Sequence, residues 1–328
     1  MENVLSGMRP TGKLHLGHLH GVLKNWVKLQ NDYNCFYFAA DWHALTSELK
    51  NTAEIKENIY SMIADWLSVG ISPEKSVIFV QSHIKEHAEL HLLLSMITPL
   101  GWIERNPTYK ELKKELKGKD INSYGFLGYP VLQTVDIIMY KAKYVPIGID
   151  QLPHLELSRE IVRRFHYLSN SEIFVEPEPI FTEVSKLSGT DGRKMSKSYG
   201  NAIYISDEGK ALEKKILNLV TDTNRVRRKD PGSPSKCMAY EFHKLYCTED
   251  ELKMINEECP KAKIGCFDCK KILLNRIVEK LTPIQEKRKE ILKEKNYIAD
   301  IILEGDKKAR EKAKATMEEV RKIMHLDY

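Results

Sequence analysis

The sequence predicts an α/β fold in which a doubly wound parallel sheet is followed by a second, all-helical domain. Through residues 1–199 short apolar segments alternate with helical patterns, which is typical of a parallel sheet with helices on both faces. Over residues 200–328 apolar residues recur at helical spacing, and no segment favours a strand. Because 42% of the 328 residues are hydrophobic, the chain can build a core in each of these two domains.

Four strands are expected in the first domain, because four segments are short, apolar and rich in β-branched or aromatic residues. They are Val4-Leu5, 35–41, 76–82 and 143–151. Pro130 suits the first turn of a helix, where its missing N–H needs no partner. Helices are expected after Gly17 and at about 53–69, 86–98, 108–117, 128–140 and 152–165.

The second domain is predicted to hold helices over 210–220, 250–258, 269–281, 283–295 and 307–326. The net charge of +5 arises here, because residues 201–328 hold 28 Lys and Arg against 23 Asp and Glu. A basic excess in one domain suits a polyanionic partner such as RNA. No apolar run reaches the roughly 18 residues of a membrane span and no signal-peptide pattern is present, so a cytoplasmic protein without membrane contact is expected.

The stretch MRPTGKLHLGHLHG places His15, Gly17 and His18 where the first strand should lead into the first helix. A helix N-terminus at this position offers free N–H groups to phosphate, although the turn lacks the G-x-G-x-x-G pattern of dinucleotide-binding proteins. Glycine lets a flat group approach the backbone, and two imidazoles can donate hydrogen bonds to a phosphoryl oxygen as charge develops. The turn therefore predicts a nucleotide site, with two surface histidines as the alternative.

A second stretch, DGRKMSKSYGN (191–201), combines two lysines with two serines between flanking glycines. Such a cationic, hydroxyl-bearing loop suits the binding of a triphosphate, and an ordinary basic surface loop is the alternative. The residues are Lys194, Ser196, Lys197 and Ser198.

Together, HLGH (15–18) and KMSKS (194–198) resemble the signature pair of the class I aminoacyl-tRNA synthetases. Further segments resemble the tryptophan branch of that family, and they extend the resemblance over essentially the whole chain. They are LSGMRPTGKLHLGH, ADWHALT (40–46), YPVLQTVDI (129–137), VPIGIDQLPHLELSRE (145–160) and GTDGRKMSKS (189–198).

The resemblance implies a Rossmann-like catalytic domain over 1–199 and a helical, tRNA anticodon-binding domain over 200–328. It implies that L-tryptophan is activated with ATP to tryptophanyl-adenylate, with release of pyrophosphate, and is then transferred to tRNA(Trp). Mg²⁺ is expected to arrive with ATP, since no carboxylate cage for it is visible. A homodimer is also implied.

Tryptophan and tyrosine enzymes share this fold, and Asp136 could accept a hydrogen bond from an indole N–H or from a phenol. In the tyrosine branch a tyrosine of the first strand usually shares the phenol, whereas Leu5 stands at the matching position here. A bare aspartate facing an apolar wall would reject phenylalanine by about 10⁴–10⁵. Tryptophan is therefore the predicted substrate. Gln133, often Met in tryptophan enzymes, and Ile149, often Glu, depart from the branch.

Roles follow from the resemblance, residue by residue. The catalytic residues are expected to be His15, His18, Lys194 and Lys197. ATP is expected to contact Arg9, Pro10, Thr11, Gly17, His18, Lys110, Gly148, Ile149, Asp150, Leu187, Lys194, Met195, Ser196, Lys197 and Ser198. Tryptophan is expected to contact Leu5, His43, Tyr129, Gln133, Asp136 and Gln151, with His43 packed against the indole and Tyr129, Gln133 and Gln151 near the α-amino group. A solvated helix position is the alternative for Lys110.

Three other functions stay open at this point. They are a tyrosyl-tRNA synthetase, a nucleotidyltransferase of the same superfamily, and an inactive paralogue that only binds. Nucleotidyltransferases usually lack the long helical domain, and the intact HLGH and KMSKS elements speak against an inactive paralogue.

Cysteines are concentrated late in the chain, where Cys237, Cys259, Cys266 and Cys269 read C-x21-C-x6-C-x2-C. Disulfides are unusual in the cytosol, and four thiolates suit a [4Fe–4S] cluster or, as the alternative, Zn²⁺. Some tryptophan enzymes that resemble this chain carry an iron–sulfur cluster at such cysteines. Cys247 is the alternative fourth ligand. Because these residues lie far along the chain from the two signature stretches, we expect the cysteine site to leave adenylation unaffected.

Overall fold

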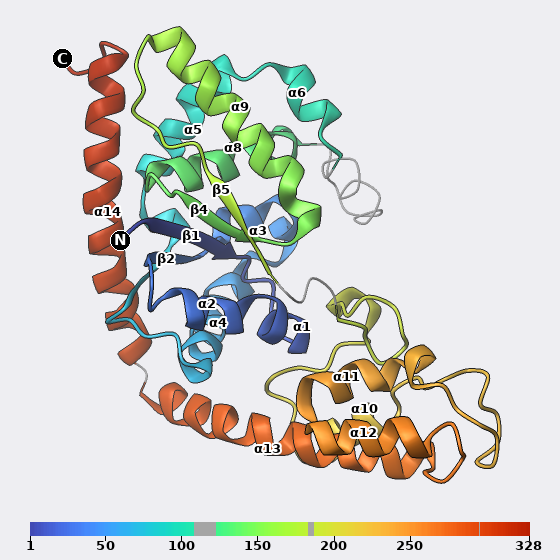
Figure 1. Cartoon of the computed structure of the whole chain (residues 1–328). Coiled ribbons are helices and arrows are strands. Elements are labelled where there is room, and N and C mark those ends of the chain that lie inside the picture. The colour runs from blue at the N-terminus through green and yellow to red at the C-terminus, as the bar shows by residue number, and fades with distance from the viewer. Residues whose placement is uncertain (108–122, 183–186, 295) are drawn as a thin grey trace. The chain divides into compact units, whose positions relative to one another are not determined.

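The computed structural model describes residues 1–107, 123–182, 187–294 and 296–328. They form a five-stranded, all-parallel sheet in the order β3-β2-β1-β4-β5 (Figure 1). This order confirms the predicted doubly wound α/β fold, because the sheet grows from β1 in both directions. The strands are β1 (Asn3–Met8), β2 (Asn34–Ala39), β3 (Ser76–Val80), β4 (Tyr144–Ile147) and β5 (Glu178–Phe181).

The central strands carry the core. β1 and β2 pair along their whole length, from Asn3 opposite Asn34 to Met8 opposite Ala39. Five of the six residues of β2 are buried, which explains why its apolar sequence NCFYFA predicts a strand. In doubly wound sheets ligands bind beyond the carboxyl ends of the strands where the order reverses, here between β1 and β4.

All four predicted strands are present, and a fifth was missed. β5 lies at the edge of the sheet beside β4, and none of its four residues is buried. Its sequence, EPIF, therefore lacks the apolar run of a central strand. Pro179 is tolerated because an edge strand has one side without a partner.

Helices connect the strands of the sheet. The expected helix at 108–117 lies outside the described residues. A π-helical segment, Leu19–Leu23, interrupts the first connection. The helices are α1 (Leu16–His18), α2 (Lys24–Leu29), α3 (Asp41–Glu48), α4 (Ile55–Val69), α5 (Glu86–Ile97), α6 (Leu100–Arg105), α8 (Tyr124–Met139) and α9 (Leu152–Ser169). Of these, α3 and α6 were not predicted.

The predicted start of the helix at 128–140 is wrong. α8 begins at Tyr124, where the Ser123 side chain caps the helix by accepting from Phe126 N–H at 3.2 Å. Pro130 therefore lies inside the helix. Thr134 Oγ1 donates to the Pro130 carbonyl at 3.0 Å, so side-chain hydrogen bonding supports the backbone there.

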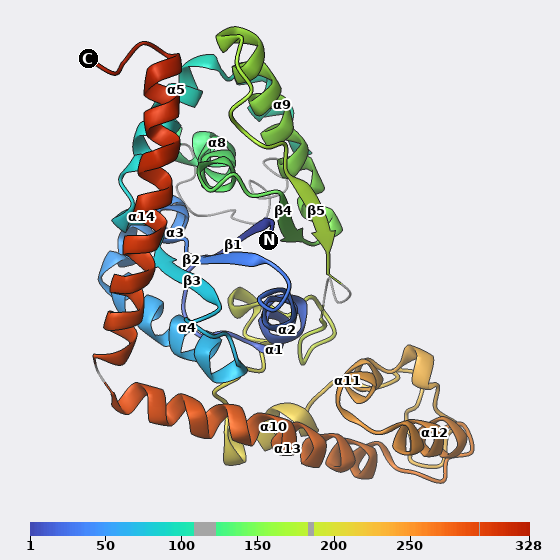
Figure 2. The same cartoon turned by 60° about the vertical axis from the view of Figure 1, so that its left-hand side comes forward.

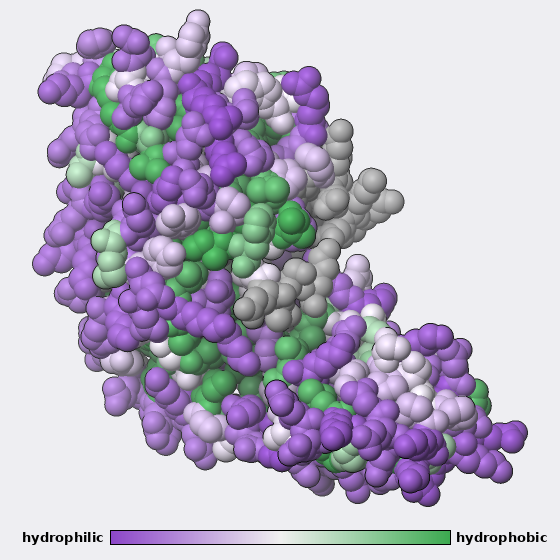
Figure 3. Space-filling model, in the orientation of Figure 1, coloured by the Kyte–Doolittle hydropathy of each residue, from purple (hydrophilic) through white to green (hydrophobic). Residues whose placement is uncertain are grey.

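The later helices are α10 (Gly209–Leu217), α11 (Met238–Tyr246), α12 (Glu249–Glu258), α13 (Cys266–Lys293) and α14 (Tyr297–Ile323). Two predicted helices on either side of Pro283 are a single helix, α13, with the proline inside it. α11 was not predicted. The visible surface over α12 and α13 is mostly hydrophilic, as their charged sequences suggest (Figure 3). No helix of the described residues is long and apolar enough to cross a membrane.

Contacts divide the chain into two compact units. Unit 1 comprises 1–12, 25–183 and 294–328 and contains the sheet; unit 2 comprises 13–24 and 184–293. The HLGH and KMSKS stretches and the five late cysteines therefore belong to the same unit. These units are defined by contacts, and the functional division predicted at residue 200 stays a prediction.

Within unit 1, α14 lies along β3 (Figure 2). The contact is closest at Gly305, where an added Cβ would come within 1.8 Å of the Ile78 carbonyl oxygen. The next residue, Asp306, accepts a hydrogen bond from Val80 N–H at 3.1 Å and contacts His83. Glycine at 305 therefore permits the helix to reach the sheet.

Gly305→Ala is expected to lower the free energy of unfolding by about 1–3 kcal/mol or more, because a backbone carbonyl cannot yield as a side chain can. Urea denaturation measures it. Gly125→Ala is the control, since nothing lies within 4 Å of its added Cβ. Equal stability of the two variants would contradict the described packing of α14.

Candidate active site and cysteine pocket

The HLGH turn of unit 2 is built by its own histidines. His15 caps α1, its Nδ1 accepting from Gly17 N–H at 3.1 Å, while His18 Nδ1 accepts from His15 N–H at 3.1 Å. Backbone N–H groups only donate, so in each neutral ring the proton resides on Nε2. Both imidazoles therefore keep one N–H donor for another group, as phosphate binding requires.

Burial keeps both rings neutral. It lowers the pKa of His15 to about 4 and that of His18 well below its usual value, and the positive charge of Lys197 lowers both further. An added Cβ at Gly17 would lie 2.9 Å from the His15 ring, so glycine is required by the cap itself. The approach of adenine to Gly17 stays a prediction.

The KMSKS loop is organised by Asn201, a residue that the sequence analysis missed. The buried Asn201 amide accepts from Ser196 N–H at 2.8 Å and donates to the Lys194 carbonyl at 3.2 Å and to Asp191 at 2.6 Å. The hydrogen bond from Asn201, and to a smaller extent that from Arg193, lowers the pKa of Asp191 to about 2. The loop is thus held at its base while the Lys194 side chain is exposed.

The two signature stretches are joined within unit 2 by backbone hydrogen bonds. Leu16 N–H donates to Ile203 O at 2.9 Å, and Ile205 N–H donates to Leu14 O at 3.0 Å. The segment that follows KMSKS therefore pairs with the HLGH turn. This explains how two stretches that are separated by 175 residues of sequence place imidazoles and lysines in one compact unit.

In unit 1 the predicted specificity residue, Asp136, is buried in α8 as expected. Its carboxylate accepts from His43 Nε2 at 2.8 Å, from His87 Nδ1 at 2.7 Å, and from Gln81 Nε2 at 2.8 and 2.9 Å. Burial opposes its charge, but the hydrogen bonds from the two histidines hold its pKa below the usual value. Asp136 is thus a buried, ionised hydrogen-bond acceptor.

The expectation of a bare carboxylate against an apolar wall is therefore wrong. Three side chains share its oxygens, and one of them is His43, which was expected to pack against the indole. The His43 ring N–H is chemically similar to an indole N–H. Its bond at Oδ2 marks the place where a substrate N–H could bind.

Gln81, His87 and Tyr140 were also missed. All three are buried, and His87 Nε2 lies 2.7 Å from Tyr140 Oη. The buried Gln81 Oε1 has no hydrogen-bond partner among the described residues. Gln81 directly follows β3. A polar residue at the carboxyl end of a predicted parallel strand was the sequence signal that could have identified it as a candidate site residue.

The other residues that were predicted to contact the substrate tryptophan have varied surroundings in unit 1. Leu5 is buried in the core beside Phe36 and Phe38. Tyr129 Oη lies 2.8 Å from His154 Nε2, and burial raises its pKa. Gln133 and Gln151 are partly exposed. Their contact with substrate stays a prediction.

The predicted ATP residues fall in both units. In unit 1, Arg9 donates to Ser47 Oγ, and its pKa is lowered chiefly by burial. Gly148 permits Asp150 to fold back, because an added Cβ would lie 2.6 Å from its carboxylate. Pro10 is buried and Thr11 partly so, whereas Ile149 is exposed. Lys110 lies outside the described residues.

In unit 2, Met195 N–H donates to the Leu187 carbonyl at 2.9 Å, and both side chains are buried. Lys197 and Ser196 are half-buried, whereas Ser198 is exposed. The structure therefore groups Leu187 with the KMSKS loop, as the ATP prediction requires, without testing nucleotide contact.

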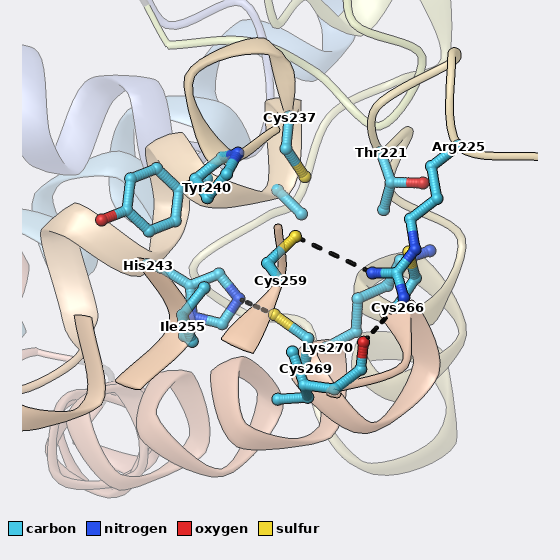
Figure 4. Close-up of a pocket in the computed structure, with 13 residues that line it drawn as sticks. Thr221, Arg225, Cys237, Tyr240, His243, Ile255, Cys259, Cys266, Cys269 and Lys270 are labelled. Atoms are coloured by element: carbon cyan, nitrogen blue, oxygen red, sulfur yellow. Dashed lines mark hydrogen bonds between the residues drawn. The ribbon is translucent and has the colours of Figure 1, made fainter. Parts of the chain in front are cut away.

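Four cysteines line one pocket of unit 2: Cys237, Cys259, Cys266 and Cys269 (Figure 4). Cys247 is not among the lining residues, although His243 lies between it and Cys269, with S···N distances of 3.2 and 3.3 Å. Arg225 Nη1 lies 3.8 Å from Cys259 Sγ, and Lys270 also lines the pocket. The spacing thus predicted which thiols lie together.

The pocket contains the thiols that could bind a metal ion or cluster, but their side chains are not arranged as a metal site. Within the described ranges no group of three or more His, Cys, Asp or Glu side chains is arranged to hold a metal ion. Burial, and then the neighbouring thiols, raises the pKa of Cys269 to about 12, and burial also raises those of Cys237 and Cys259. Ligation would therefore release protons, and Arg225 and Lys270 would offset the thiolate charge.

Comparisons with known proteins agree over the whole chain. The family described as "tRNA synthetases class I (W and Y)" matches residues 2–282. The chain is 56% identical to the tryptophan–tRNA ligase of Thermotoga maritima, covering 98% of this chain and 99% of that one, and 46% identical to that of Aquifex aeolicus, with the same coverage. Among solved structures it is similar to a Campylobacter jejuni tryptophanyl-tRNA synthetase complexed with ADP and tryptophan. That match has a TM-score of 0.89 and 35% identity, and it covers 99% of this chain and 100% of the other.

Proposed function

The chain belongs to the tryptophan and tyrosine group of the class I tRNA synthetases, and we infer that it is a tryptophan–tRNA ligase that uses ATP. The observation that carries this inference is the pairing of the HLGH turn with the segment after KMSKS in one compact unit. Full-length relatives that are 40% or more identical carry the tryptophan name, which does not favour the tyrosine alternative.

In the proposed reaction a carboxylate oxygen of tryptophan attacks the α-phosphorus of ATP, and the bond to pyrophosphate breaks. Charge gathers on the phosphoryl oxygens, so the residues act by positioning and by electrostatic stabilisation. We assign this role to the Nε2–H groups of His15 and His18 and to the ammonium groups of Lys194 and Lys197. A hydroxyl of the tRNA terminal ribose then attacks the acyl carbon, and AMP leaves.

Tryptophan recognition is assigned to the Asp136 network of unit 1. The ionised, buried carboxylate accepts the indole N–H, which takes the place of the His43 N–H at Oδ2. His87 and Gln81 continue to hold the other lone pairs. ATP contacts at Arg9, Pro10, Thr11, Gly148, Ile149 and Asp150 follow from the resemblance, as does a homodimer in the cytoplasm.

Charging of tRNA(Trp) with labelled tryptophan tests the function. The expected result is ATP-dependent formation of tryptophanyl-tRNA(Trp), with no product from tRNA(Tyr) and tyrosine. Adenylate formation without tRNA charging would favour the nucleotidyltransferase alternative, and absence of both would favour the inactive paralogue.

We also propose that the four pocket cysteines hold a [4Fe–4S] cluster, with Zn²⁺ as the alternative. The support is the donor set, the common pocket and the nearby cations. Such a group would cross-link the loops that precede α11 and α13. Its binding free energy would become local folding free energy.

Protein purified without oxygen is expected to contain iron and acid-labile sulfide, because four thiolates complete the ligand set of one cluster. Cys266→Ser is expected to lose most of this iron, whereas Cys247→Ser retains it because Cys247 lies outside the pocket lining. Elemental analysis and visible absorption measure both. Protein that holds neither iron nor zinc would contradict the proposal, and loss of metal from Cys247→Ser would reassign the fourth ligand.

A further inference from the structure

Helix α11 contacts each of the three features of unit 2 that bear on chemistry. Cys237 precedes it at the N-cap and Cys247 follows it at the C-cap. Its His243 touches Cys269, its Tyr246 touches the helix after HLGH, and its Glu241 touches the strand-like segment before KMSKS.

The contact with the HLGH segment is buried and specific. Tyr246 Oη lies 2.8 Å from His20 Nε2, and the two rings meet edge-to-face with centroids 5.1 Å apart. Both side chains are buried. His20 is two residues after His18 and lies in the π-helical segment Leu19–Leu23. Single-turn π segments are frequent at functional sites, and here the hydrogen bond fixes the turn that follows HLGH.

Glu241, five residues before Tyr246 on α11, contacts the segment that precedes KMSKS. Glu241 accepts from Ser188 Oγ at 2.9 Å, and Ser188 pairs with Lys194 across the base of the loop. An added Cβ at Gly192 would lie 3.6 Å from Met238, the first residue of α11. Helix α11 therefore contacts the segment that follows HLGH and the segment that precedes KMSKS.

The contact with the cysteine pocket lies on the same helix face as Tyr246. His243 and Tyr246 are three residues apart and so are neighbours on the helix surface. Figure 4 shows His243 pointing at Cys269 from α11, at 3.3 Å. Cys269 thus contacts His243, and His20 contacts Tyr246, while His243 and Tyr246 are linked by one turn of α11.

We propose that His20 and Tyr246 are positioning residues for amino-acid activation, and that α11 makes this step depend on the state of the cysteine pocket. A change at Cys269 shifts His243, α11 carries the shift to Tyr246, and the HLGH imidazoles lose their alignment. The idea rests on the proposed function of HLGH, and it replaces the expectation that the cysteine site leaves adenylation unaffected.

Tryptophan-dependent ATP–pyrophosphate exchange of the full-length chain tests the positioning role. Tyr246→Phe and His20→Leu are expected to lower kcat by up to about 100-fold, as misplacement remote from the chemistry can. KM for tryptophan should stay unchanged, because its predicted contacts lie in unit 1. His20→Gln, which keeps a hydrogen-bonding group, should restore most of kcat. Tyr167→Phe, at an exposed tyrosine, is the matched control.

A double-mutant cycle with Cys269→Ser tests the dependence, whatever the pocket binds. Cys269→Ser should lower kcat in the parent but have little further effect in Tyr246→Phe, with a coupling factor in the range of about 5–150. Hydrogen exchange of the amides of residues 15–23 should quicken in Cys269→Ser and in Tyr246→Phe alike. This second readout needs no activity and keeps the test valid if one variant is poorly active.

The outcomes separate the two claims. If the parent exchanges pyrophosphate and Tyr246→Phe has the same kcat, the proposed role of α11 is wrong. The same holds if the effects of Tyr246→Phe and Cys269→Ser on kcat are independent. Neither result would affect the proposed function. A parent that shows no exchange with any amino acid overturns the proposed function itself.

Discussion

Lys194→Ala is expected to lower kcat for tryptophan-dependent pyrophosphate exchange by about 10²–10³-fold, with little change in KM for tryptophan. The Lys194 side chain is exposed at the end of a loop whose base is fixed by Asn201, so its ammonium is free to meet charge that develops on the leaving phosphates. Removing one such donor costs about 2.7–4 kcal/mol of transition-state stabilisation. Lys197→Ala, His15→Ala and His18→Ala should behave in the same way.

Steady-state exchange at varied tryptophan and ATP separates kcat from KM. Lys214→Ala, at an exposed lysine of α10 in the same unit, controls for general loss of positive charge. A Lys194→Ala enzyme with the parent's kcat and only a raised KM would show that the loop binds ground-state ATP without acting in the transition state.

Asp136→Ala is expected to lower kcat/KM for tryptophan by roughly 10²–10⁴-fold. The change removes a buried charge and leaves His43, His87 and Gln81 without their acceptor, a disruption that typically costs about 3–5 kcal/mol. Part of that cost falls on folding, so thermal unfolding must be measured beside exchange. Thr134→Ala, which removes a buried side-chain hydrogen bond from the same helix, is the control for stability.

A substrate isostere tests the same contact without altering the protein. Replacing the indole N–H by sulfur should lower kcat/KM by roughly 10- to 150-fold, the cost of about 1.5–3 kcal/mol for one hydrogen bond to a charged group. This loss of kcat/KM is smaller than the discrimination of about 10⁴–10⁵ expected of a bare carboxylate, because His43 can again donate to Asp136 Oδ2 when the substrate has no N–H. If the parent treats the two amino acids alike, the indole N–H is read elsewhere.

The central strands and the signature stretches could be predicted because their local sequence is decisive. NCFYFA is apolar on both faces and forms a central strand, and HLGH and KMSKS are recognisable as short patterns. EPIF was missed because an edge strand needs no apolar run. Pro130 and Pro283 misled because tertiary packing lets a helix continue through a proline that local propensity would place at its end.

The Asp136 network shows the limit more clearly. A buried helical aspartate was evident from its apolar neighbours, but its partners come from α3, from the turn after β3 and from α5. Gln81 and His87 lie 55 and 49 residues away from it in sequence. Likewise, His20 and Tyr246 are 226 residues apart, so no local pattern could predict that they share a hydrogen bond.

ATP–pyrophosphate exchange with tryptophan and with tyrosine, each as the sole amino acid, tests the central claim most directly. The account predicts rapid exchange with tryptophan and a far lower kcat/KM for tyrosine, because the apolar side chain of Leu5 offers the phenol no second hydrogen-bond partner beside Asp136. Equal or faster exchange with tyrosine would contradict it.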